Sequence, residues 1–245
     1  MTAVGGVTGR AGPAGPLRVV FEDNHLLVVV KPAGLLAQAD RTGDPDVLTL
    51  AKAYVKQAYA KPGDVYLGLV HRLDRPVSGL MVLARTSKAA ARLSAGFRER
   101  TVSKDYFALV EGRLTGAGTR VDWLRKRDEH VEIVAETAEG AQRAALGWEA
   151  VAHDGARTLV AVALETGRPH QIRVQLAALG HPIAGDRRYG GRAPWRPGAI
   201  ALHSYRLAVE HPTQRVPVVF TAEPVGWPPA FARAIRAWLD APGGA

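Results

Sequence analysis

The residues best suited to chemistry gather in one short stretch, His71-Arg72-Leu73-Asp74-Arg75, in which a carboxylate stands between cations. An Asp flanked by positive charges stays ionised near neutral pH, because neighbouring cations favour the charged carboxylate. Such a carboxylate can act as a nucleophile, as a general base or as half of a structural salt bridge. The residue types alone leave these roles open.

Two apolar segments flank this stretch and are predicted to position it. The run Tyr66–Val70 precedes it, and the run Leu80–Ala84 follows after the connection Pro76–Gly79. Both runs have the length and composition of buried β-strands. Side chains on a turn between two buried strands are held on a rigid frame. We therefore expect Asp74 to lie on an elbow between two strands.

Apolar periodicity predicts further elements along the chain. Strands are expected at 17–22, 26–31, 104–110, 130–136, 143–153, 157–165, 202–207 and 215–221. Helices are expected at 47–60, after a cap at Thr86 or Ser87, at about 172–179 and after Pro228-Pro229. The segment 113–128 is basic and is predicted to be irregular. Many strands with few helices and short turns indicate an α+β protein with a mostly antiparallel sheet.

The charge of the chain favours a polyanionic partner. The chain of 245 residues carries 32 Lys and Arg against 23 Asp and Glu, a net charge of +9. Only seven of these basic residues are lysine, and arginine binds phosphate through a bidentate fork and stacks on bases. The surplus therefore points toward RNA or DNA, with a basic surface that has no partner as the alternative.

The sequence also excludes several classes of protein. It contains no cysteine, which excludes disulfides, thiolate metal sites and cysteine nucleophiles and fits a reducing, cytoplasmic location. No apolar run approaches the ~18 residues that a bilayer span needs, so no membrane partner is expected. Residues 1–16 are rich in Gly, Ala and Pro, and we expect a flexible tail rather than a secretory signal.

Four motifs together resemble one known family. The string His71–Asp74 followed by Ser78-Gly79 resembles the signature of the RluA-like pseudouridine synthases. Three further stretches agree with that family in order and spacing, and the resemblance covers roughly residues 17 to 225. They are Lys31-Pro32-Ala33-Gly34, Lys104-Asp105-Tyr106 and Thr166-Gly167-Arg168-Pro169-His170-Gln171-Ile172-Arg173.

The resemblance implies a fold and an organisation. The expected fold is α+β, a mixed and mostly antiparallel sheet with flanking helices and a central cleft. A single catalytic domain is expected over 17–245. Some relatives carry a small S4 RNA-binding domain in front, and we expect none here because only 16 residues precede the first strand. The resemblance implies no metal, nucleotide or redox cofactor, and a single compact domain makes a monomer the expectation.

The resemblance also assigns roles to residues at matching positions. It implies that Asp74 is the nucleophile, that Arg173 pairs with Asp74, and that Tyr106 lies against the target base. Arg72, beside the nucleophile, is expected to fill the gap that a flipped base leaves. The further residues predicted to bind RNA or orient the substrate are His71, Lys104, Arg168, His170, Gln171, Arg187 and Arg188.

Three positions depart from the family pattern, and one loop adds to it. Gln175 stands where His is usual, and Pro169 and Val77 stand where Thr is common; we expect these changes to touch the rim of the site. The loop 181–196 interleaves arginines with Tyr189 and Trp195. Arginines grip phosphates and aromatic rings stack on bases, so this loop is predicted to contact RNA.

The function predicted from the sequence is isomerisation of uridine to pseudouridine in structured RNA, ribosomal or transfer RNA. One alternative is a non-catalytic RNA-binding or RNA-folding protein on the same scaffold. A second alternative is a glycoside hydrolase, which needs another acid near Asp74. Glu165 is the only obvious candidate for that acid, and the residues around it are cationic.

Overall fold

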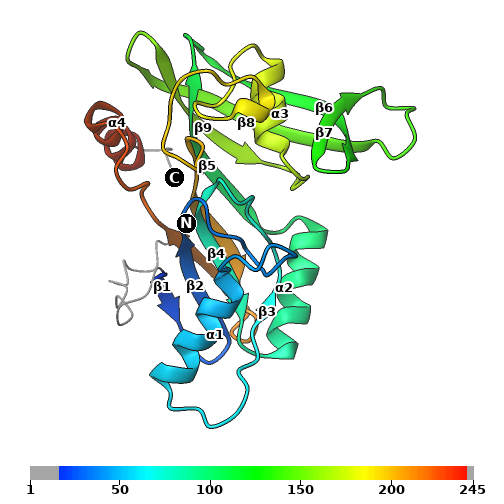
Figure 1. Cartoon of the computed structure of the whole chain (residues 1–245), viewed down its shortest axis with the longest axis vertical. Coiled ribbons are helices and arrows are strands. Elements are labelled where there is room, and N and C mark those ends of the chain that lie inside the picture. Colours follow the sequence, from blue (N-terminus) through cyan, green and yellow to red (C-terminus); the bar gives the residue numbers. More distant parts are fainter. Residues whose placement is uncertain (1–16, 242–245) are drawn as a thin grey trace. The chain divides into compact units, whose positions relative to one another are not determined.

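The computed structural model describes residues 17–241, and the predicted flexible tail lies outside the described residues. The chain divides into two compact units (Figure 1). Unit 1 holds the residues up to Lys104 together with Ser204–Ala222, and unit 2 holds Asp105–His203 together with the residues from Glu223 onward. Each unit is described by itself below.

Unit 1 is built on a sheet in the order β1-β2-β4-β10, with β3 paired to β4 and β11 paired to β10. The apolar runs form these strands because they bury their side chains on the pleated sheet. The strands are β1 (Arg18–Glu22), β2 (Leu26–Lys31), β3 (Gly68–Leu69), β4 (Ser78–Ala84), β10 (Leu202–Glu210) and β11 (Pro217–Thr221). The predicted strand at 66–70 is present only as the short β3, which pairs antiparallel with the end of β4.

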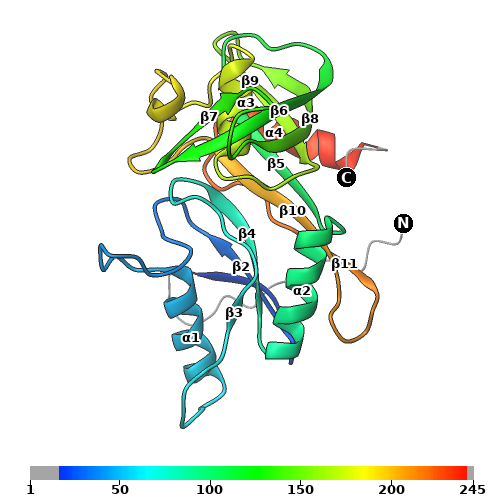
Figure 2. The same cartoon turned by 90° about the vertical axis from the view of Figure 1, so that its right-hand side faces the viewer.

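Two helices accompany this sheet, α1 (Val47–Ala58) and α2 (Ser87–Glu99) (Figure 2). Thr86 caps α2 as predicted, because its hydroxyl accepts a hydrogen bond from the backbone N–H of Ala89 at 3.1 Å. Asp46 caps α1 in the same way, at 3.0 Å from the N–H of Thr49. Ala89 and Leu93 place α2 on an apolar core shared with β2, β4, β10 and β11.

Gly79, at the start of β4, is required by its backbone and by its neighbour. Its φ is +128°, and a Cβ atom there would lie 2.4 Å from both the backbone N and the backbone O of Ser204. Gly79→Ala is therefore expected to lower the free energy of unfolding by about 3 kcal/mol or more, from backbone strain and overpacking together. Urea unfolding tests this, with Gly63→Ala as the matched control because nothing lies within 4 Å of a Cβ there. Equal stabilities of the two variants would contradict it.

Unit 2 contains a second run of paired strands in the order β5-β9-β8-β6-β7. Each neighbouring pair is antiparallel. The strands are β5 (Ser103–Glu111), β6 (Ala117–Arg127), β7 (His130–Val134), β8 (Gln142–His153) and β9 (Arg157–Leu164).

The prediction that 113–128 is irregular is wrong, because β6 occupies 117–127. Its charged side chains find partners along or across the sheet. Arg120 pairs with Asp122 at 2.6 Å and Arg125 pairs with Glu132 of β7 at 2.9 Å. A strand whose charges are paired on the sheet surface lacks the simple apolar alternation on which the prediction relied.

Unit 2 also holds α3 (Gln171–Ala178), the short 3₁₀ helix η1 (Arg187–Tyr189) and α4 (Pro229–Asp240). Val174 of α3 packs with Leu124, Val131 and Ala144 of the sheet. The predicted C-terminal helix is confirmed as α4, whose Trp238 ring meets the Phe107 ring edge to face at 5.5 Å.

The α+β class with a mixed, mostly antiparallel sheet is confirmed. The pairs β1–β2, β2–β4, β3–β4 and β10–β11 of unit 1 and the four pairs of unit 2 are antiparallel, and an isolated bridge between Leu36 and Asp46 is parallel. No helix within residues 17–241 is both long enough and apolar enough to span a membrane.

Candidate active site

Asp74 lies in unit 1, on the predicted elbow between β3 and β4. The backbone N–H of Val77 donates to the carbonyl of Asp74 at 3.0 Å and closes a tight turn. Leu73 and Val77 are buried on either side, whereas Asp74 is half-buried and Arg72 is exposed. Two buried anchors around a short turn fix the backbone from which the Asp74 carboxylate projects.

Lys31, the last residue of β2, holds this turn in place through hydrogen bonds to its backbone and to neighbouring backbone. Its fully buried ammonium donates to three backbone carbonyls, those of Pro32 at 3.0 Å, Leu35 at 2.7 Å and Arg75 at 2.9 Å. Three acceptors match the three N–H donors of an ammonium group. Burial lowers the pKa of Lys31 to about 7, and the negative charge of Asp74 opposes the shift.

The same two segments are joined a second time. The backbone N–H of Gly34 donates to the carbonyl of Arg75 at 2.8 Å, and Nε of Arg75 donates back to the carbonyl of Gly34 at 3.1 Å. The Arg75 guanidinium also pairs with the exposed Asp44 at 2.8 Å. The Lys-Pro-x-Gly motif and the Asp74 motif thus form one hydrogen-bonded unit.

His71 anchors the start of the turn. Its Nε2 accepts a hydrogen bond from the backbone N–H of Val82 on β4 at 3.0 Å, and its ring stacks on Phe97 of α2 at 4.6 Å. Burial lowers the pKa of His71 to about 3, with Lys104 adding to the shift, so the ring is neutral. Burial also lowers the pKa of Lys104, with Arg100 contributing. The imidazole is therefore placed to orient the turn.

Tyr106 lies in unit 2, on β5, and is buried. Residues directly opposite each other in antiparallel strands share a face of the sheet. Tyr106 lies opposite Val162 on β9, Val162 lies opposite Trp148 on β8, and Trp148 lies opposite Gly118 on β6. Residues an even number apart on a strand lie on the same face, and Gly118 precedes Leu124 of β6 by an even number. Leu124 packs against Val174 of α3, so Tyr106 lies on the face of the sheet that packs against α3.

Arg173 of α3 is held by a carboxylate of its own unit. Its Nε and Nη2 donate to the two carboxylate oxygens of Asp186 at 2.7 and 2.9 Å. Both side chains are nearly inaccessible, with 6 % and 1 % of their surface exposed. The Cζ of Arg173 also lies 5.1 Å from the ring centre of Tyr189.

His170, the residue before α3, shares this neighbourhood. Its backbone is left-handed, with a φ of 51°, and its Nδ1 lies 2.7 Å from the hydroxyl of Tyr189. That hydroxyl accepts from the backbone N–H of Val131 at 3.0 Å. Burial raises the pKa of the Tyr189 phenol.

Gln171 and Arg168 shape the turn that leads into α3. The side-chain oxygen of Gln171 accepts from the hydroxyl of Thr166 at 2.8 Å and from the backbone N–H of Arg168 at 3.0 Å. Its amide nitrogen donates to the carbonyl of Ala145 at 3.0 Å. Nε of Arg168 donates to the carbonyl of Arg143 at 3.1 Å.

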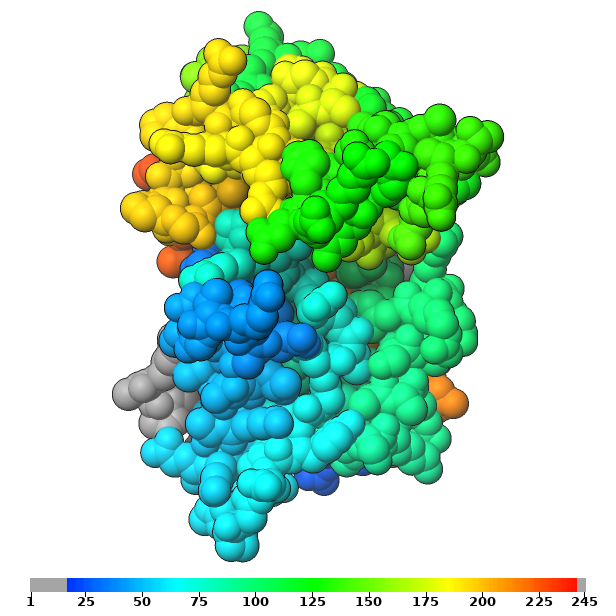
Figure 3. Space-filling model, turned by 45° about the vertical axis from the view of Figure 1, so that its right-hand side comes forward, coloured from blue at the N-terminus to red at the C-terminus, as the bar shows by residue number. Residues whose placement is uncertain are grey.

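Arg187 and Arg188 lie on η1 and are exposed. Arg188 reaches the β6–β7 connection, where its Nη2 lies 3.4 Å from the carboxylate of Glu129. Figure 3 shows this segment, in yellow, beside the green β6–β7 hairpin on one face of unit 2. Both arginines are therefore accessible to a large polyanion.

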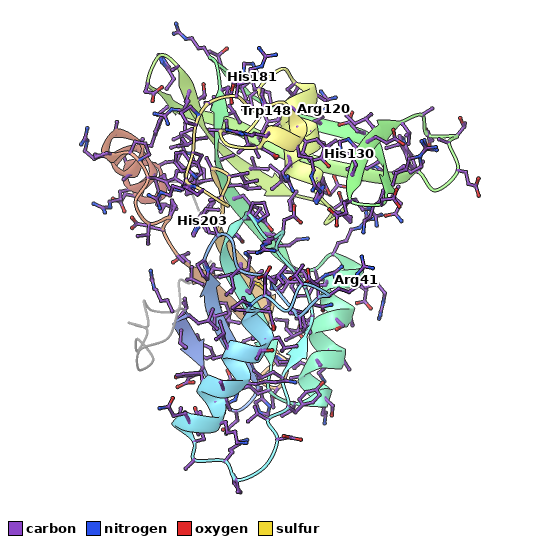
Figure 4. The ribbon with its side chains drawn as sticks, in the orientation of Figure 1. Arg41, Arg120, His130, Trp148, His181 and His203 are labelled. Carbon is purple, nitrogen blue, oxygen red and sulfur yellow. The ribbon has the colours of Figure 1, made fainter. Side chains whose placement is uncertain are left out.

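The prediction that the three departures from the family pattern touch the rim is wrong for two of them. Val77 is buried, and the side chain of Gln175, a residue of α3, is fully buried. The Gln175 amide donates to Asp122 at 2.8 Å, and Asp122 in turn pairs with Arg120, which is labelled in Figure 4. Within residues 17–241 the Gln175 oxygen is buried without a hydrogen-bond partner. The Gln175 side chain therefore makes its contacts in the interior of unit 2.

Sequence reasoning assigned no individual site role to Lys31 or Asp186, and it placed Tyr189 only in a loop expected to contact RNA. For Lys31 the sequence contains a signal, a lysine that ends an apolar strand directly before Pro-x-Gly, since a buried ammonium needs acceptors.

Glu165, the acid considered for a glycosidase, is exposed and pairs with Arg143 at 2.5 Å. Asp74 thus lies in unit 1, whereas Tyr106 and Arg173 lie in unit 2.

Solved structures of two human proteins share this fold. RNA pseudouridylate synthase domain containing 4 matches with a TM-score of 0.71 and 22 % identity over 89 % of this chain and 91 % of that chain. RNA pseudouridylate synthase domain containing 1 matches with a TM-score of 0.68 and 25 % identity over 91 % of this chain and 89 % of that chain. The fold is therefore that of pseudouridine synthases.

The sequence gives the family directly. Residues 25–178 match the model of the RNA pseudouridylate synthase family. Ribosomal large subunit pseudouridine synthase D of Nitrosomonas europaea is 36 % identical over 205 residues, which cover 80 % of this chain and 59 % of that protein. The protein of the same name from Zymomonas mobilis is 34 % identical over 221 residues, covering 85 % of this chain and 69 % of that protein. The chain belongs to the RNA pseudouridylate synthase family, and it spans 59–69 % of the length of these two relatives.

Proposed function

We propose that this chain isomerises uridine to pseudouridine in the RNA of the large ribosomal subunit, with Asp74 as the nucleophile. The observation that carries the proposal is that the family match, residues 25–178, includes Asp74, Tyr106 and Arg173. The names of the relatives from Nitrosomonas europaea and Zymomonas mobilis favour ribosomal over transfer RNA. The surplus of arginine favours an RNA partner in either case.

In the proposed reaction, the target uridine first leaves its stack at a cost of a few kcal/mol, and Arg72 takes its place. The Asp74 carboxylate then bonds covalently to the nucleotide, at the ribose or at the base. The bond from ribose C1′ to uracil N1 breaks, uracil turns, and C1′ bonds to uracil C5. C5 loses its proton and N1 gains one, so substrate and product are isomers and Asp74 is released unchanged.

The remaining residues position the reacting groups. Arg173 is proposed to pair with Asp74, keeping the carboxylate ionised and aimed. Tyr106 is proposed to stack on the flipped base, an interaction of about 1–3 kcal/mol. Lys31 and His71 hold the turn that carries Asp74 through their bonds to backbone groups.

The arginines of η1 are proposed to bind RNA phosphates. The double variant Arg187→Ala/Arg188→Ala is expected to weaken RNA binding and to reduce the slope of log affinity against log salt concentration by about 2, since each phosphate contact contributes about 0.9. Filter binding at several salt concentrations measures this slope. Arg236→Ala is the control, because Arg236 is an exposed arginine of α4 paired with Glu223. An unchanged slope in the double variant would remove these arginines from the interface.

The proposed function is tested by incubating the protein with large-subunit ribosomal RNA and, separately, with transfer RNA, and then mapping pseudouridine. New sites in ribosomal RNA alone support the proposal as stated. New sites in transfer RNA alone keep the reaction but overturn the substrate. Tight, salt-sensitive binding with no product in either RNA would favour a non-catalytic RNA-binding protein.

A further inference from the structure

The proposed reaction requires the Arg173 guanidinium to be held in the orientation that pairs it with Asp74. Unit 2 contains two groups that contact this guanidinium. Asp186 binds it through two parallel hydrogen bonds of 2.7 and 2.9 Å. Tyr189 lies against it with a distance of 5.1 Å from Cζ to the ring centre. Both residues belong to one short segment, Asp186–Tyr189, which we name the clamp turn.

The ion pair between Arg173 and Asp186 is expected to contribute little to the free energy of unfolding. Both side chains are buried, and removing two charges from water costs about as much as their attraction returns. What a bidentate pair does supply is geometry, because the planar guanidinium and the planar carboxylate align in one orientation. A guanidinium has five N–H donors, and this pair uses two of them, which leaves three for other acceptors.

The clamp turn is itself held firmly. The backbone carbonyl of Asp186 accepts from the N–H groups of Tyr189 at 3.1 Å and Gly191 at 2.9 Å. A Cβ at Gly191 would lie 2.4 Å from the carbonyl oxygen of Ile183, so the chain winds closely around Asp186. The Tyr189 hydroxyl bonds to both Val131 and His170. The His130 ring, labelled in Figure 4, lies 5.1 Å from the Tyr189 ring.

We propose that Asp186 is a positioning residue for the reaction, which together with the Tyr189 ring sets the direction in which Arg173 presents its remaining donors. This inference rests on the proposed function, because it gives Arg173 its role beside Asp74. It adds a carboxylate that does not touch the substrate and acts only through Arg173. Asp186 therefore controls the rate of the chemical step and contributes little to RNA affinity.

The first readout does not depend on activity. In ¹⁵N spectra, the Nε–H of Arg173, assigned by its loss in Arg173→Lys, is expected to exchange slowly with water because it is buried against Asp186. In Asp186→Asn this signal is expected to shift and to exchange faster. An unchanged signal would show that the pair does not hold Arg173 in solution and would overturn the inference whatever the enzyme does.

The second readout is the single-turnover rate of pseudouridine formation, measured beside RNA affinity. Asp186→Asn is expected to lower the rate about 100-fold, the effect of a small misplacement of a catalytic group. RNA affinity is expected to stay within about threefold, since phosphate contacts dominate it. A folded Asp186→Asn with the wild-type rate would overturn the positioning role.

Two further variants separate positioning from stability. Asp186→Glu keeps a charge for Arg173 but moves it, so it is expected to fold and to react more slowly than wild type; if Asp186→Asn does not fold, a full rate in Asp186→Glu overturns the inference. Asp122→Asn breaks the comparable bidentate pair with Arg120, whose bonds are 2.6 and 2.9 Å. It is expected to lose stability and keep its rate, and an equal loss of rate there would overturn the specific role of Asp186. A wild type without product overturns the proposed function instead, and with it the catalytic part of this inference.

Discussion

Asp74→Asn is expected to abolish pseudouridine formation while leaving the protein folded and able to bind RNA. The substitution keeps the size of the side chain but removes the anionic oxygen that would attack the nucleotide. The backbone bonds of the turn, including the one between Val77 and Asp74, do not involve the side chain. The single-turnover rate is therefore expected to fall by about 10⁴-fold or more, as it does when a nucleophile is removed.

The control for this experiment is Asp64→Asn, which removes one exposed carboxylate from the same unit. It is expected to leave the rate unchanged. Asp74→Ala should match Asp74→Asn, and it guards against recovery of activity through deamidation of the new asparagine. Product at the wild-type level from Asp74→Ala would show that Asp74 is not the nucleophile.

Lys31→Met is expected to lower the free energy of unfolding by about 3 kcal/mol or more, because buried carbonyls that lose a donor each cost about 1–3 kcal/mol. The three carbonyls belong to Pro32, Leu35 and Arg75. Methionine matches the length of lysine without any N–H group. The rate is also expected to fall, since the carbonyl of Arg75 lies directly beside Asp74 in the chain. Urea unfolding and single-turnover kinetics measure the two effects.

Lys52→Met is the matched control, because Lys52 is an exposed lysine of α1. It is expected to change neither stability nor rate. A Lys31→Met protein as stable as Lys52→Met would show that the three hydrogen bonds do not hold the turn.

Lys31 also predicts a dependence of stability on pH. Its pKa is about 7 in the folded protein against 10.5 for the ordinary group. Between these values the unfolded chain binds a proton that the folded protein does not, so stability rises with pH across this window. The difference in unfolding free energy between wild type and Lys31→Met is therefore expected to grow by about 1.4 kcal/mol per pH unit above pH 7. A constant difference from pH 7 to pH 9 would show that Lys31 stays charged.

Much of the local structure follows from the sequence. The apolar runs that become β2 and β4 bury one side chain after another, and the Thr86 cap sets the start of α2. The elbow with Asp74 was predictable because two strand-like runs bracket a charged stretch. The four motifs also indicated the family, which the match over residues 25–178 confirms.

The tertiary structure decided which groups hold the functional residues. The Lys31 ammonium finds one of its acceptors at Arg75, 44 residues further along the chain. Arg173 is paired with Asp186 within its own unit, a contact that neither spacing nor motif indicated. Gln175 of α3 is fully buried, although its departure from the family pattern was expected to touch the rim of the site.

The same cause explains the misread strand β6. Its charges suggested a loop, yet Arg125 is satisfied by Glu132 across the β6–β7 pair. The spacing of apolar residues indicates whether one segment favours a helix or a strand and which of its faces is apolar. A buried or half-buried charge instead depends on acceptors and counter-charges that only the packing of distant segments supplies.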